Sequence, residues 1–279
     1  MTARVKRHVR SGSAELCVED TATGGPALVC LHAGVTDKRL WAPQLEAFDA
    51  AHRVVAYDRR GFGETRLPPP REREAFAHVD DLRAVLDALA IDRAVLMGCS
   101  QGGRLAIDAA LAHPERVSAL VLVACSVSGA PDDASGPFDA PIAALVEQLE
   151  AAEARGDREA LNELEAQAWL DGPAEPAGRV QGALRALFLD MNGVALAAAY
   201  PGEVIDAASA WDSLEEIRVP VLIVWGTLDF PHFGPRMRTL ARRIAGAQSF
   251  VMEGVAHLPG LEQPAVFNAA VAAFLAGVR

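Results

Sequence analysis

Long apolar runs are missing from this sequence of 279 residues: none reaches about 18 residues, the length that a membrane-spanning helix requires. The basic segment 1–10 is not followed by a hydrophobic stretch, so we expect no signal peptide. Positive charge is in deficit, because 37 acidic residues outnumber 26 lysines and arginines and leave a formal net charge of −11. We therefore expect neither nucleic acid nor a membrane surface as a partner.

Cysteine is also scarce. Cys17, Cys30, Cys99 and Cys125 show neither the spacing of a metal site nor that of a disulfide framework. Free thiols in a reducing compartment explain them most simply, so we expect a cytoplasmic protein. The sequence contains no H-E-x-x-H spacing and no G-x-G-x-x-G after the first strand of a βαβ unit. It therefore predicts no metal and no cofactor.

Short apolar runs are abundant, and they alternate with helical patterns along most of the chain. An opening hairpin is predicted at 5–10 and 14–19. Further strands are predicted at 27–31, 53–57, 94–97, 117–124, 219–225 and 248–252. Strands that are apolar throughout and separated by helices are typical of a parallel sheet covered on both faces. The fold class expected is therefore α/β, with a mostly parallel eight-stranded sheet.

The alternation stops near Gly129. Residues 131–211 instead contain stretches rich in alanine, leucine and glutamate, with helical patterns at 142–154, 158–170 and 179–192. We interpret this segment as an inserted helical cap. In that interpretation residues 1–130 and 212–279 form the core, and residues 131–211 form the cap.

Residues 98–102 read Gly-Cys-Ser-Gln-Gly, a G-x-S-x-G motif between an apolar strand and a helical pattern. A tight turn in this context exposes the serine, and flanking glycines let strand and helix pass closely. The following helix N-terminus directs free N–H groups toward the site. Ser100 is thus a candidate nucleophile, unless it is an incidental serine in a glycine-rich turn. Cys99 occupies a position that points away, so we expect it to pack.

Two later residues could serve such a nucleophile. Asp229 comes just after the strand predicted at 219–225, and His257 lies in the loop after 248–252. In open α/β sheets, catalytic groups collect at the carboxyl ends of strands, so all three side chains are expected there. Asp212 could be the acid instead, although no convincing strand precedes it.

With these motifs the chain resembles α/β-hydrolase fold proteins over nearly its whole length, apart from the cap. The resemblance rests on residues 32–34, 58–63, 98–102, 226–229 and 254–257. The family usually has His-Gly where this chain has His32-Ala33, which leaves the backbone geometry of the oxyanion loop less well defined.

The resemblance implies a role for each motif. Ser100 would be the nucleophile, His257 its general base, and Asp229 the group that orients the imidazole. The oxyanion hole would consist of the backbone N–H groups of Gln101 and Gly34, with Val35 as the next candidate for the second donor.

Several further polar residues receive structural interpretations by the same resemblance. Asp58 and Arg59 are expected to brace their loop, and His32 to hold the oxyanion loop. His52, His78 and His113 precede or follow surface helices, so we expect them to be solvated.

Residues that could contact a substrate are Val35, Trp169, His232 and Leu258, although His232 could equally face solvent. In the cap, Phe188, Met191 and Tyr200 could also line a pocket. At helical spacing such residues more often belong to a core.

The resulting hypothesis is hydrolysis of a small carboxylic ester or lactone through an acyl-Ser100 intermediate. Enol-lactone hydrolases and carbon–carbon bond hydrolases of ring-cleavage products share the triad, so the triad does not separate them. The same residues are compatible with a cofactor-free perhydrolase or haloperoxidase, and with a ligand receptor that lacks turnover. Haloalkane dehalogenation is disfavoured, because it requires an aspartate where Ser100 stands.

The partner expected is a small molecule, and a homodimer is left open.

Overall fold

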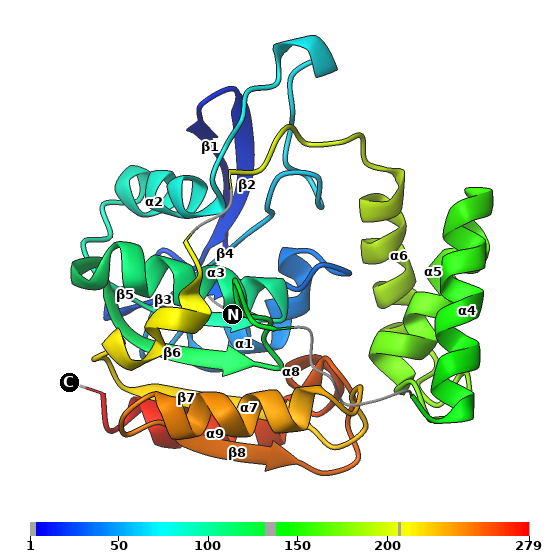
Figure 1. Ribbon diagram of the computed structural model, residues 1–279. Helices are drawn as coiled ribbons and strands as arrows, with labels where there is room; N and C mark the ends of the chain where they lie inside the picture. Colours follow the sequence, from blue (N-terminus) through cyan, green and yellow to red (C-terminus); the bar gives the residue numbers. More distant parts are fainter. Residues whose placement is uncertain (1–3, 132–137, 206–207, 279) are drawn as a thin grey trace.

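Eight strands form a single sheet in the order β1-β2-β4-β3-β5-β6-β7-β8 (Figure 1). The computed structural model describes residues 4–131, 138–205 and 208–278. The strands are β1 (Val5–Ser11), β2 (Ala14–Asp20), β3 (Ala27–Leu31), β4 (Arg53–Tyr57), β5 (Ala94–Cys99), β6 (Val117–Val123), β7 (Val221–Gly226) and β8 (Gln248–Met252). β2 pairs antiparallel with β1 and β4, and all later neighbours are parallel. The predicted sheet is confirmed.

The central strands are buried over their whole length, which is why their sequences are apolar without interruption. Successive side chains point to opposite faces of the sheet. In β5, Leu96 belongs to the hydrophobic cluster on one face, whereas Val95 and Met97 belong to the cluster on the opposite face.

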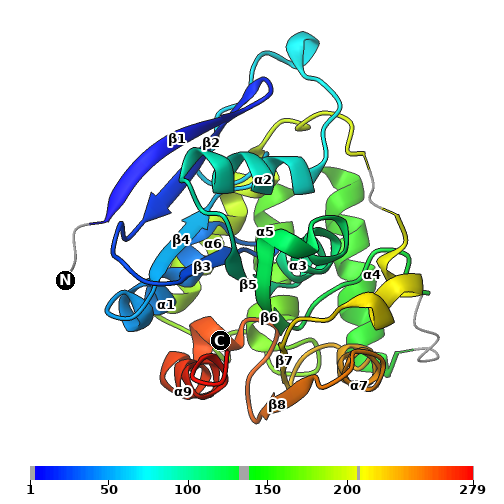
Figure 2. The same cartoon turned by 90° about the vertical axis from the view of Figure 1, so that its left-hand side faces the viewer.

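Helices cover both faces (Figure 2). One face carries α1 (Ala42–Phe48) and α9 (Pro264–Leu275), and the other carries α2 (His78–Ala88), α3 (Gln101–Ala112) and α7 (Phe233–Arg243). Short helical segments complete the connections: η1 (Lys38–Trp41), η2 (Pro70–Glu72), η3 (Pro114–Arg116), η5 (Ala210–Glu216) and α8 (Pro259–Glu262). Across the described parts of the chain, no helix is both long and apolar enough to cross a membrane.

Between β6 and β7 the chain forms α4 (Ala140–Arg155), α5 (Arg158–Ala166) and α6 (Ala183–Ala197). These helices stand together beside the carboxyl ends of the strands (Figure 1). Phe188 and Met191 of α6 are fully buried in the cluster shared with the sheet, whereas Tyr200 is 69% exposed. The first two residues are therefore core, and Tyr200 faces solvent. The division at residues 131 and 211 stays a prediction.

Two predicted cap helices have different limits in the structure. The helix expected at 158–170 ends as an α-helix at Ala166 and continues as a π-helical turn, η4 (Gln167–Asp171). The helix expected at 179–192 begins only at Ala183. The chain before it contains Gly172, Gly178 and Gly182 at positive φ, a conformation that interrupts a right-handed helix.

Candidate active site

Ser100 lies at the junction of β5 and α3, where the backbone turns sharply. Its φ of 54° and ψ of −117° fall in a region that residues other than glycine rarely adopt. Three backbone hydrogen bonds hold the turn: Ser100 N–H donates to Val123 O at 2.8 Å, and Ser100 O accepts from Arg104 N–H at 3.1 Å and from Ser126 N–H at 3.3 Å. Strain of this kind is concentrated at functional positions, and Ser100 remains partly exposed.

Glycines on both sides of Ser100 allow β5 and α3 to approach each other. A Cβ at Gly98 would lie 2.2 Å from Gly102 O, and one at Gly102 would lie 2.1 Å from Leu31 O. No side chain fits at such distances, so the close backbone approach itself requires glycine. Cys99 is buried, and burial raises the pKa of its thiol, which disfavours a nucleophilic thiolate.

Asp229 and His257 meet beyond the carboxyl ends of β7 and β8. His257 Nδ1 lies 2.7 Å from Asp229 Oδ2, and the side chains of the histidine and the aspartate are only 1% and 2% exposed. Asp229 Oδ1 accepts a hydrogen bond from Phe230 N–H at 2.8 Å. Because a carboxylate only accepts, the imidazole carries a proton on Nδ1 and keeps Nε2 as its basic atom.

Ser100 and His257 are close in the fold but not bonded to each other. Cys99 Sγ, one residue before the serine, lies 3.5 Å from His257 O. Among the hydrogen bonds of the described residues, none joins the Ser100 hydroxyl to the imidazole. Catalytic hydrogen bonds are often long without substrate and shorten when it binds.

The second candidate acid, Asp212, lies in η5, where its charge acts on Arg243 of α7.

The two residues predicted for the oxyanion hole are in contact. A Cβ at Gly34 would lie 2.7 Å from Gln101 Nε2, so the Gln101 side chain lies against the Gly34 backbone. His32 is fully buried and links this loop to the end of β4: its Nδ1 lies 2.8 Å from Ala33 O, and its Nε2 accepts from Arg59 N–H at 3.0 Å. Burial and the charge of Arg59 keep the pKa of His32 well below its usual value, so the ring is neutral.

Aromatic rings surround the imidazole of His257. Trp169 in η4 and Phe233 at the start of α7 each have their ring centroid 4.7 Å from it. The ring of His232 lies 4.6 Å from that of Phe233. The two remaining residues expected to contact substrate pack with the cluster that contains α1 and α9: Val35 is partly buried, and Leu258 is 1% exposed. Trp169 is thus the predicted contact residue that lies directly against the candidate triad.

The prediction that His52, His78 and His113 are solvated is wrong for His52 and His78, whereas the side chain of His113 remains 29% exposed. All three are partly buried, and the Nδ1 atoms of His52 and His78 are inaccessible. Each of these two rings packs edge-on against a neighbouring phenylalanine, at 6.2 Å from Phe48 and 5.1 Å from Phe76. The sequence marked them as helix-flanking but did not show that aromatic side chains would cover them.

One group of potential metal ligands occurs in the described chain: Cys17, Asp58 and Glu64. Lys38 already occupies its centre, with Nζ 2.7 Å from Asp58 and 2.9 Å from Glu64. Asp58 also accepts from the backbone N–H groups of Lys38 and Glu64, at 2.8 Å each. The group is therefore a buried ion-pair network that braces the loop after β4.

The sequence profile of the alpha/beta hydrolase family matches residues 28–270, nearly the whole chain from β3 to α9. The chain belongs to this family. The resemblance inferred from the motifs is thereby confirmed, and so is the fold class.

Relatives of this hydrolase carry several different names. A Rhizobium rhizogenes protein named as a carbamate hydrolase, RutD, is 31% identical over 254 residues, which cover 84% of this chain and 87% of that protein. The 2-hydroxy-6-oxo-2,4-heptadienoate hydrolase of Pseudomonas putida is 35% identical over 126 residues, which cover 44% of this chain and 45% of that protein. The enol-lactonase of Burkholderia xenovorans superposes with a TM-score of 0.75 at 25% identity, over 98% of this chain and 100% of that one.

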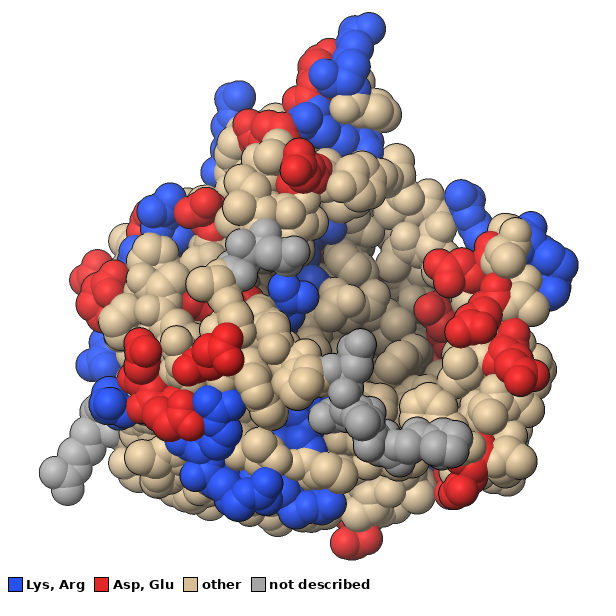
Figure 3. Space-filling view, viewed as in Figure 1, with Lys and Arg blue, Asp and Glu red and all other residues tan. Residues whose placement is uncertain are grey.

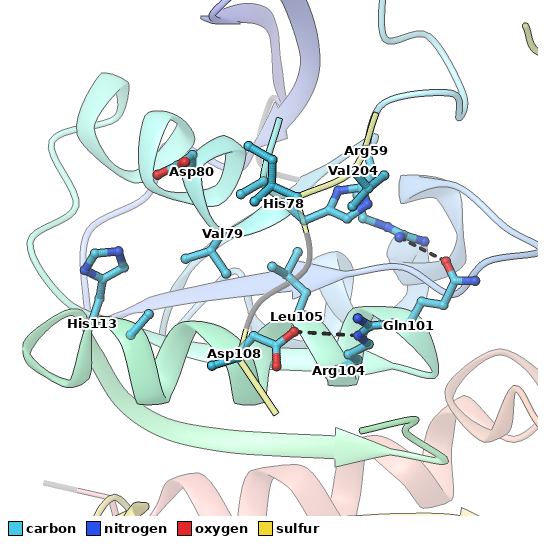
Figure 4. Close-up of a pocket in the computed structure, with 14 residues that line it drawn as sticks. Arg59, His78, Val79, Asp80, Gln101, Arg104, Leu105, Asp108, His113 and Val204 are labelled. Carbon is cyan, nitrogen blue, oxygen red and sulfur yellow. Dashed lines mark hydrogen bonds and ion pairs between the residues drawn. The ribbon is translucent and has the colours of Figure 1, made fainter. Parts of the chain in front are cut away.

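Sequence reasoning missed a cavity of about 530 Å³ beside the turn from β5 to α3 at residues 98–102, which we call the elbow (Figure 4). Arg59, His78, Gln101 and Arg104 line it, and Val204 lies beside Arg59, across from the side chains of α3. In the space-filling view, the surface is hollowed between the sheet and the cap helices (Figure 3). The cavity joins residues from the end of β4, α2, α3 and the segment after α6, which no local sequence pattern connects.

Proposed function

We propose that this protein is a serine hydrolase that cleaves a small carboxylic ester or lactone through an acyl-Ser100 intermediate. The observation that carries the proposal is the pairing of Asp229 with His257 at the same sheet edge as a serine held at positive φ. Membership of a hydrolase family supports it.

The geometry suggests how each group would act. Asp229 engages Nδ1 of His257, so Nε2 takes the proton from the Ser100 hydroxyl as its oxygen attacks the substrate carbonyl. The backbone N–H groups of Gln101 and Gly34 stabilise the oxyanion of the tetrahedral intermediate. His257 then protonates the departing alkoxide. A water molecule, deprotonated by the same Nε2, hydrolyses the acyl-enzyme and regenerates Ser100.

The surroundings of the Asp229–His257 pair fit a small and partly apolar substrate. The rings of Trp169 and Phe233 pack against His257, and Phe230 lies 4.9 Å from Trp169. These rings exclude water from the imidazole, which strengthens its interaction with the Asp229 carboxylate. Trp169 belongs to the chain between α5 and α6, so this segment contributes directly to the site.

The test is hydrolysis of p-nitrophenyl esters of increasing acyl chain length by the wild type and by Ser100→Ala. We expect steady turnover by the wild type and a loss of about 10⁴-fold or more in kcat for the variant, because the nucleophile is removed. The chain length with the highest kcat/KM measures the acyl pocket. A wild type that releases a single burst, or that matches Ser100→Ala, would overturn the proposal and favour a ligand receptor without turnover.

Carbon–carbon bond hydrolysis is a second candidate. It is favoured by the likeness to the Pseudomonas putida 2-hydroxy-6-oxo-2,4-heptadienoate hydrolase. Amide-like substrates are a third candidate for the same acyl chemistry, since another relative is named as a carbamate hydrolase. Parallel assays with a dienoate ring-cleavage product and with a carbamate distinguish these candidates from ester hydrolysis by their relative kcat/KM.

A further inference from the structure

Arg59 is a buried cation with most of its donors unused. The residue is 3% exposed, and Nη1 donates to Gln101 Oε1 at 3.1 Å. Its guanidinium also lies over the Phe62 ring, 4.7 Å from the centroid. Nε and Nη2 are buried and have no hydrogen-bond partner among the described residues. Burial lowers the pKa of Arg59 to about 10, which still leaves it charged at neutral pH. A buried charge normally requires a partner.

The two unused donors form one side of the guanidinium fork. Elsewhere in this protein the same side binds a carboxylate. Arg53 donates from Nε and Nη2 to Asp20 at 3.1 and 2.7 Å, and Arg60 donates to Asp81 at 3.0 Å from each. This bidentate geometry is the characteristic way in which arginine recognises a carboxylate. Arg59 presents the same pair of atoms, and no carboxylate of the described residues accepts from them.

Arg59 is one of the residues that line the cavity beside the elbow (Figure 4). The charged side chains of its α3 wall are engaged: Asp108 accepts from Ser128 Oγ at 2.8 Å and lies 3.7 Å from Arg104. His78 is neutral, because burial and the nearby arginine charges lower its pKa to about 3. The position of greatest uncompensated positive charge on the cavity wall is therefore Arg59.

The cavity starts next to the proposed nucleophile. Gln101, which bonds to Arg59, directly follows Ser100, and Arg104 donates its backbone N–H to Ser100 O. A substrate whose carbonyl lies over Ser100 would enter this space if it extended past Gln101, which lines the cavity. A negatively charged group at its far end then meets the Arg59 fork.

We propose that Arg59 binds a carboxylate of the substrate, so that the natural substrate is a small acidic ester or lactone. This inference rests on the proposed function of Ser100.

The test compares mono-p-nitrophenyl glutarate, which carries a free carboxylate, with p-nitrophenyl pentanoate, its uncharged match in chain length. We expect the wild type to prefer the acid in kcat/KM. In Arg59→Met, the ratio of acid to neutral ester should fall about 10- to 100-fold, the range for hydrogen bonds to a charged group. Arg59→Lys should keep part of the ratio, because it retains the charge and loses the fork.

Arg71→Met is the matched control. It removes the same unit charge at a side chain that is 85% exposed in η2, so its ratio should equal that of the wild type. An unchanged ratio in Arg59→Met overturns the proposal. So does an equal loss on both esters, which would mean that Arg59 only positions Gln101.

A binding readout separates this inference from the proposed function. Glutarate alone should raise the melting temperature of the wild type and leave that of Arg59→Met unchanged. If neither ester is hydrolysed but glutarate still stabilises the protein through Arg59, the proposed function fails and the carboxylate site stands. Equal stabilisation by inorganic phosphate would show a general anion site and would overturn the assignment to a carboxylate.

Discussion

Arg59 and Arg60 are adjacent in the sequence, yet their environments are opposite. Arg60 is bound by Asp81 and by Ser11 O, so its charge is matched inside the protein. Among the described residues, the Arg59 guanidinium donates only to Gln101, and Arg59 belongs to the lining of a cavity. An isolated buried charge destabilises the fold unless a partner of opposite charge binds it. The unmatched charge of Arg59 is therefore the feature that points to a ligand.

His78, on the wall of the same cavity, allows a prediction about pH. Burial, followed by the charges of Arg59 and Arg104, lowers its pKa to about 3, whereas an unfolded histidine titrates near 6.5. The folded state therefore resists protonation, and stability is lost as the pH falls from about 6.5 to about 3. His78→Gln removes this loss, so its free energy of unfolding relative to wild type should rise as the pH falls through that range.

Urea unfolding at pH 7, 5 and 4 measures this difference. His8→Gln is the control, since His8 is exposed and its replacement should leave the pH dependence of stability unchanged. Parallel curves for His78→Gln and wild type would contradict the prediction.

The unit of strand, turn and helix that carries Ser100 depends on backbone contact more than on side chains. Gly98 in β5 faces Gly102 at the start of α3, and Gly102 faces Leu31 in β3. Three elements are thus in close backbone contact next to Ser100. The elbow is rigid because its surroundings leave no room for another conformation.

Gly98→Ala tests this packing at the level of the element. A methyl group 2.2 Å from Gly102 O forces β5 and α3 apart, so we expect a loss of more than about 4 kcal/mol in stability, or failure to fold. Gly24→Ala is the matched control: no atom of the described residues lies within 4 Å of its Cβ position, and we expect a change within about 0.5 kcal/mol. Melting temperatures of both variants measure the contrast, and a stable Gly98→Ala would show that the elbow is not tightly packed.

Across the whole molecule, the segment between α5 and α6 is joined to the loop that carries His257 through Arg179. Its Nη2 donates to Leu170 O at 2.8 Å and to Glu262 at 2.6 Å. Glu262, in α8, also accepts from Ala256 N–H at 2.7 Å, one residue before His257. His257 is thus held from two sides, by Asp229 and by this network.

Arg179→Met should disturb both stability and catalysis. It leaves Glu262, which is 5% exposed, as a buried carboxylate without its cation, and we expect a loss of about 2–3 kcal/mol, reduced because Arg179 itself is 23% exposed. Activity should fall as well, since the loop before His257 loses its anchor. Urea midpoints and kcat/KM measure the two effects. Arg155→Met, at the exposed end of α4, should match the wild type in both, and equal values for all three proteins would exclude the coupling.

Local sequence patterns were sufficient to predict the sheet, the elbow and the order of Ser100, Asp229 and His257. These features follow local rules, in which an apolar run predicts a strand and a glycine-flanked serine predicts a turn before a helix. Helix limits in the cap were less well predicted, because glycines at positive φ and a π-helical turn do not alter the hydrophobic pattern.

The pairing of charges, by contrast, depends on the tertiary fold. Arg59 reaches Gln101 across 42 positions of the sequence, and Arg60 reaches Asp81 across 21. The sequence around these two arginines does not indicate which distant residues they bind, because each partner comes close only when the helices pack on the sheet. The proposed identity of the nucleophile could therefore be derived from the sequence, whereas the proposed chemistry of the substrate required the fold.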